Sequence, residues 1–170
     1  MSEKFLRPAI SENCSSPDKK INFVTHSLGG ILVRDFLAKN ELPNLGRVVM
    51  FAPPNCGGEL ADFLQKFRSF RFVFGPALAE LGTNLKSVPR NLPLPDFELG
   101  IIAGNRSPNP ILAKIIPGVD DGKVSVAATK LATMTDFVEV SSSHTFIFNS
   151  EKNLELVKNF LESGKFEKIN

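Results

Sequence analysis

The feature that most constrains the fold is a short apolar run that ends in a serine and two glycines, residues 21–30. Its first residues, Ile21-Asn22-Phe23-Val24, have the apolar and aromatic content of a buried strand. Beyond Gly30, apolar residues recur at helical spacing, at Ile31, Leu32, Val33, Phe36 and Leu37. The run therefore predicts a strand that turns sharply into a helix at Ser27, which projects the serine hydroxyl from the carboxyl edge of a sheet.

The remainder of the chain continues this alternation of strand and helix. Further strands are expected at 47–52, 99–103 and 137–140, and a closing amphipathic helix at 154–161. Alternation of this kind is typical of a mostly parallel sheet with crossover helices on both faces. With 170 residues, 42% of them apolar and 22% charged, the chain suits one α/β domain over residues 1–170.

Residues 57–97 form an apolar insertion between the second and third predicted strands. Five of the 15 phenylalanines lie in its stretch 63–74, namely Phe63, Phe67, Phe70, Phe72 and Phe74. Two interpretations are open: helices packed on the sheet, or a lid or cap that walls a binding site over the serine. The spacing of the phenylalanines does not separate them.

Composition excludes several classes of partner. The net charge of +2 comes without a dense block of Lys or Arg, so nucleic acid and anionic membranes are not expected partners. No stretch approaches the roughly 20 apolar residues of a membrane span, and no apolar signal core lies near the N-terminus, so we expect a cytoplasmic protein. The two cysteines, Cys14 and Cys56, lack the spacing of a metal site. We expect reduced thiols, no metal and no cofactor.

Ser27 needs a base before its hydroxyl becomes a nucleophile, and the chain has only two histidines. His26 is adjacent to Ser27, and neighbouring side chains diverge on a tight turn, which favours a packing role. His144 follows the fourth strand in a serine-rich loop, where an α/β sheet gathers its site. An acid that orients this histidine is expected between the serine and the histidine, where Asp120 and Asp121 lie in a glycine-flanked turn. We favour Asp121, and the order serine, acid, histidine indicates a catalytic triad.

Four motifs together resemble the α/β-hydrolase superfamily, and most closely its lipase-like serine esterases. They are Thr25-His26-Ser27-Leu28-Gly29-Gly30-Ile31, Val48-Val49-Met50-Phe51-Ala52-Pro53-Pro54-Asn55 followed by Gly57, Asp120-Asp121-Gly122 with Val124, and Ser143-His144. The resemblance implies Ser27 as nucleophile, Asp121 as acid and His144 as base. It also implies the amide of Leu28 as one oxyanion donor, and a small acyl-ester or lipid-like substrate. The departure is Thr25, where the G-x-S-x-G pentapeptide usually has its first glycine.

Only 26 residues precede Ser27, whereas several strands precede the serine in the hydrolases that the chain resembles. The first 20 residues have room for one helix, at 3–12 with Pro8 interrupting it, but not for the roughly 30 residues of a strand-helix-strand unit. We therefore expect an N-terminally shortened hydrolase whose strand at 21–25 lies at a sheet edge and whose second oxyanion donor is missing. An open edge recruits partners, which predicts a homodimer through this strand, cover by the N-terminal segment, or aggregation.

Two functions follow from these patterns. The first is hydrolysis of carboxylic esters through a Ser-His-Asp triad and an acyl-enzyme intermediate, with weak turnover because an oxyanion donor is missing. The alternative is a shortened, non-catalytic hydrolase that serves as a binding or interaction module through its strand edge or an apolar groove. Thioester and amide substrates stay open.

Overall fold

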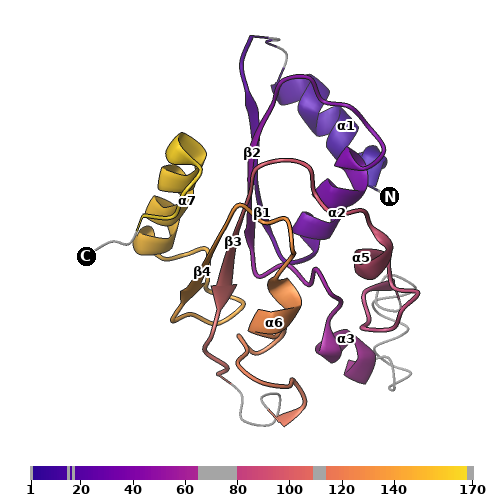
Figure 1. Ribbon diagram of the computed structural model, residues 1–170, viewed down its shortest axis with the longest axis vertical. Coiled ribbons are helices and arrows are strands. Elements are labelled where there is room, and N and C mark those ends of the chain that lie inside the picture. Colours follow the sequence, from indigo (N-terminus) through magenta and orange to yellow (C-terminus); the bar gives the residue numbers. More distant parts are fainter. Residues whose placement is uncertain (1, 15, 17, 65–79, 109–113, 168–170) are drawn as a thin grey trace.

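Four parallel strands form one sheet, and they follow one another across it in chain order (Figure 1). The strands are β1 (Ile21–His26), β2 (Leu45–Phe51), β3 (Leu99–Gly104) and β4 (Asp136–Val140). The computed structural model describes residues 2–14, 16, 18–64, 80–108 and 114–167. All three strand pairings are parallel, which confirms the predicted α/β class.

Helices cover both faces of the sheet, as predicted. Helices α1 (Ser2–Asn13) and α2 (Leu28–Leu37) lie on one face, and α7 (Glu151–Ser163) lies on the other (Figure 1). In the described parts of the connections between strands lie three short helices: α3 (Glu59–Leu64), α5 (Val88–Asn91) and α6 (Val126–Thr129). Within the described ranges, no helix combines the length and the apolar content needed to cross a bilayer.

Helix α1 runs through Pro8, so the expected interruption of the helix at this residue is wrong. A proline removes one main-chain hydrogen bond from a helix interior. Contacts of the residues before the proline with the end of α2 offset this loss. Ser2 Oγ donates to the Asp35 carboxylate, and the Arg7 guanidinium donates to Asn40 Oδ1 at 2.6 Å. Tertiary contacts thus override the local preference of the chain.

The core has two layers because successive residues of β2 point to opposite faces of the sheet. Val48 and Met50 pack with Val33 of α2 on one face. On the other face, Val49 and Phe51 pack with three residues of α7, namely Leu156, Val157 and Phe160. Strand β3 is buried at all of its positions. Strands β2 and β3 therefore form the buried centre of the sheet.

Strand β1 lies at an edge, since it pairs with β2 alone among the described strands. Val24 of β1 is 49% exposed, although its partner in the sheet register, Val49, is fully buried. The N-terminal helix packs on α2 and leaves this side chain open to solvent. The strand that precedes Ser27 therefore has the edge position that the sequence predicted.

The structure describes both ends of the insertion at 57–97 but, of the five phenylalanines in its stretch 63–74, only Phe63. The prediction about the other four falls outside the described residues. The two described ends contact one another, because the Gly58 amide donates to the Leu81 carbonyl at 2.8 Å. The two described stretches on either side of residues 65–79 therefore lie side by side at this point. Its role as a lid or cap stays a prediction.

Candidate active site

Ser27 occupies the turn between β1 and α2 with φ 53° and ψ −123°. A positive φ is uncommon for a residue with a side chain and costs about 1–3 kcal/mol, so surrounding contacts must hold it. Two main-chain hydrogen bonds do so. The Ser27 amide donates to the Phe51 carbonyl at 2.8 Å, and the Ser27 carbonyl accepts from the Gly30 amide at 3.1 Å. The turn places the serine at the carboxyl end of the edge strand.

The two glycines after the serine allow α2 to approach the end of β2 closely. A Cβ at Gly30 would lie 2.9 Å from Met50 Sδ and 3.2 Å from Pro53 Cβ, so a larger residue would push the helix away. A Cβ at Gly29 would lie 3.4 Å from Thr25 Cβ. This is an ordinary van der Waals distance, so Thr25, the departure from the pentapeptide, fits beside Gly29 without a clash.

Ser27, His144 and Asp121 form one hydrogen-bonded chain. Along the sequence, His144 lies 117 residues after Ser27 and 23 residues after Asp121. Ser27 Oγ lies 3.0 Å from His144 Nε2, and His144 Nδ1 lies 2.8 Å from Asp121 Oδ2. The histidine is 3% exposed and the aspartate 1% exposed. Because a carboxylate only accepts hydrogen bonds, Nδ1 carries the ring proton and Nε2 is the acceptor that faces the serine hydroxyl.

Asp121, and not its neighbour Asp120, lies beside the histidine. The second oxygen of Asp121 accepts from the amides of Lys123 and Val124, both at 2.9 Å, which fixes the carboxylate plane. Asp120 Oδ1 instead accepts from the amide of Gly122 at 2.7 Å. Asp120 therefore shapes the turn, while Asp121 faces the histidine.

His26 has a contact that sequence reasoning did not anticipate. Its Nε2–H donates to the carbonyl of His144 at 2.9 Å, and the two imidazole rings lie 4.7 Å apart between centroids. The ring of Phe148 also packs against His26, with 5.0 Å between the two ring centroids. Burial lowers the pKa of His26 below its ordinary value, and the neighbouring His144 lowers this pKa further. His26 is therefore more than a packing residue, because it holds the main chain of the loop that carries His144.

Arg34 is a second residue that the sequence analysis missed. It is 3% exposed, and its Nη1 donates to Asn55 Oδ1 at 3.0 Å. Asn55 in turn donates to the Thr129 carbonyl at 2.8 Å, at the end of α6. These bonds connect α2, which begins beside Ser27, to the segment that follows Asp121. A charged residue among apolar ones on a helix is the signal that could have identified Arg34.

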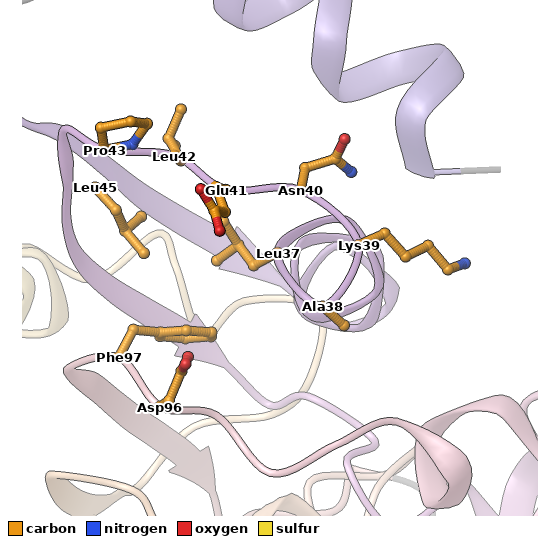
Figure 2. A pocket seen from close by; sticks show the side chains of 10 residues that line it. All are labelled: Leu37, Ala38, Lys39, Asn40, Glu41, Leu42, Pro43, Leu45, Asp96 and Phe97. Carbon is orange, nitrogen blue, oxygen red and sulfur yellow. The ribbon is translucent and has the colours of Figure 1, made fainter.

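A pocket of about 630 Å³ lies at the opposite end of the sheet from Ser27 (Figure 2). Its walls come from the end of α2, the loop to β2, and the segment before β3, where Phe97 and Asp96 face Leu37 (Figure 2). These are the amino ends of the strands, whereas Ser27 lies at a carboxyl end. Ligands of parallel α/β sheets bind at the carboxyl ends. The pocket is therefore separate from the candidate site.

No protein-family model matches the chain, and no curated protein matches its sequence. Solved structures match its fold. The lipase BlEst2 from Bacillus licheniformis in its mature form has a TM-score of 0.71 at 20% identity, over 94% of this chain and 71% of that one. Its propeptide form has a TM-score of 0.72 at 19% identity, over 99% of this chain and 40% of that one. Phospholipase PlaB from Legionella pneumophila has a TM-score of 0.51 at 20% identity, over 83% of this chain and 40% of that one.

At such low identity, this likeness establishes the fold. The chain has the α/β-hydrolase fold of these lipases, as predicted from its motifs. It spans less than half the length of the propeptide form and of the phospholipase.

Proposed function

We propose that the protein hydrolyses carboxylic esters, with Ser27 as nucleophile, His144 as general base and Asp121 as the acid that orients the base. One observation carries the proposal: the hydrogen bonds that run from Ser27 Oγ through both ring nitrogens of the buried histidine to a buried carboxylate. The positive φ of Ser27 at the end of a parallel strand supports it. The lipase fold of the solved neighbours supports the same class of reaction.

The proposed reaction has two steps. In the first, Nε2 of His144 takes the proton of Ser27 as Oγ bonds to the ester carbonyl carbon, and the carbonyl oxygen becomes an oxyanion. Collapse of this intermediate expels the alcohol, which takes the proton from the imidazolium, and leaves an acyl group on Ser27. In the second step, a water molecule attacks the acyl carbon with the same histidine as base, and the acid leaves. Asp121 stabilises the imidazolium in both steps.

The proposed oxyanion donor is the amide of Leu28, the first residue of α2. Amides of the first helical turn have no acceptor within the helix, and the helix dipole adds positive potential at this end. Among the described residues, we assign this single donor. Loss of one donor lowers turnover by about 10²–10³ in serine hydrolases, which is the size of the contribution that we assign to the Leu28 amide.

We further propose that the insertion at 57–97 acts as a lid or cap over the site. Two contacts of its described ends support this position. Glu59 accepts a hydrogen bond from Ser125 Oγ at 2.9 Å, close to the loop of Asp121. Arg34 of α2 donates to the Pro93 carbonyl at 3.3 Å. The insertion is therefore attached to both elements that flank the hydrogen-bonded chain.

Covalent labelling with a fluorophosphonate probe tests the proposal. We expect labelling of the wild-type protein and slow turnover of p-nitrophenyl acetate, and neither in Ser27→Ala. Ser11→Ala is the matched control, since its hydroxyl is exposed on α1 and bonds only within that helix, to the Pro8 carbonyl. A wild-type protein that shows neither labelling nor turnover would favour the non-catalytic binding module instead.

A further inference from the structure

An apolar groove begins at the residue that follows Ser27. It has a volume of about 200 Å³ and runs between α2 and the described end of the insertion. Its apolar walls are Leu28, Ile31 and Leu32 from α2, and Leu81 and Val88 from the insertion. Leu28 both lines the groove and carries the amide proposed as oxyanion donor. The groove therefore begins one residue along the chain from the proposed nucleophile.

The far end of the groove is charged. Asp35 and Lys39 form an ion pair there, and Glu80 of the insertion also lines the groove. Leu28 and Asp35 are seven residues apart on one helix, a distance of about 10 Å along its axis. An alkyl chain that covered the ion pair would remove two charges from water, which is unfavourable. The apolar part of the groove therefore has a defined length.

We propose that this groove binds the acyl chain of the ester and limits it to about six to eight carbons. The limit follows from the volume, because an apolar cavity of about 150 Å³ holds benzene, with six carbons. The groove, at about 200 Å³, accommodates a somewhat larger group. It serves this role only if Ser27 hydrolyses esters as proposed above, and the substrate class is then an ester of a medium-chain carboxylic acid.

A series of p-nitrophenyl esters from acetate to dodecanoate tests the chain-length limit. Each methylene buried in an apolar groove raises kcat/KM by up to about fourfold. We expect kcat/KM to rise from acetate to hexanoate or octanoate and to rise no further at dodecanoate. A continued rise through dodecanoate overturns the proposed limit. A parallel series of alkyl acetates separates the two halves of the ester: a chain-length optimum on the alcohol side, with none on the acyl side, overturns the acyl assignment.

Variants of Leu32 test the groove itself. Leu32→Phe fills it, and we expect the octanoate-to-acetate ratio of kcat/KM to fall at least tenfold. Leu32→Ala enlarges it, and we expect the optimum to move to chains longer by about two to three carbons. Leu42→Phe is the matched control, because Leu42 lines the separate pocket of Figure 2, and we expect its ratio to equal that of the wild type.

These measurements distinguish failure of the groove from failure of the chemistry. If the wild type hydrolyses acetate and reacts with the fluorophosphonate, but both Leu32 variants keep the wild-type chain-length profile, the groove does not bind the acyl chain. If the wild type has no Ser27-dependent labelling and no turnover of any ester, the proposed function fails and the groove assignment fails with it. Should Leu32→Phe not fold, the shift in Leu32→Ala decides the question.

Discussion

Replacing Asp121 by asparagine should abolish most of the activity while leaving the fold intact. Two main-chain amides, those of Lys123 and Val124, donate to Oδ1 of Asp121. In Asp121→Asn the amide oxygen has to stay with these donors, so the NH2 group faces Nδ1 of His144. This nitrogen then becomes an acceptor and the ring proton moves to Nε2, which no longer accepts the proton of Ser27.

The size of the effect follows from this change of tautomer. A base held in the wrong tautomer lowers kcat by about 10⁴ in a serine protease triad, or about 5.4 kcal/mol of barrier. Stability should change far less, because the asparagine oxygen still accepts from both amides. We expect the free energy of unfolding to fall by about 1–2 kcal/mol, the value of one weakened hydrogen bond to a charged group.

Initial rates with p-nitrophenyl butyrate and urea unfolding curves provide the two measurements. Asp120→Asn is the matched control, since among the described residues its Oδ1 accepts from Gly122, and an amide oxygen can replace it there. We expect this control to keep the wild-type rate within about twofold, well under 1 kcal/mol of barrier. If Asp121→Asn stays within tenfold of the wild-type rate while Ser27→Ala is inactive, Asp121 does not orient the base.

Three further predictions concern stability and association. Arg34→Met should lower the free energy of unfolding, measured in urea titrations, by about 3–5 kcal/mol. The substitution removes the guanidinium that donates to the buried Asn55 oxygen and to nearby carbonyls. A loss below about 1 kcal/mol would contradict the role given to Arg34. Burial lowers the pKa of His26 in the folded protein. The neutral imidazole therefore stabilises the fold fully above the pKa of about 6.5 that it has in the unfolded chain, and this stabilisation is lost as the pH falls through the folded pKa. Melting temperatures from pH 7.5 to 5 should therefore fall more steeply for the wild type than for His26→Gln, and parallel curves would refute this. We propose that two copies pair through β1, where Val24 is exposed. Light scattering should then show a dimer for the wild type and a monomer for Val24→Lys. A monomeric wild type would exclude the pairing.

Local signals in the sequence were sufficient for the architecture. The apolar run before Ser27 and the glycines after it predict the strand, the turn and the helix, because strand and helix periods and the freedom of glycine act over a few residues. Strand positions at 99–103 and 137–140 agree with β3 and β4 to within one residue. The expected break at Pro8 was wrong, and the contacts of the preceding Ser2 and Arg7 with the end of α2 stabilise this helix.

The sequence by itself determined the α/β alternation and the order of Ser27, the acid and His144, since both depend on residue type and position along the chain. Only the tertiary structure decided which carboxylate of the Asp120-Asp121 pair meets the histidine. Adjacent side chains point in different directions, and the amides of residues 122–124 orient each one. The same holds for the bond from His26 to the loop of His144 and for the bond from Arg34 to Asn55. These contacts join segments more than 20 residues apart, so no local pattern records them and only packing brings them together.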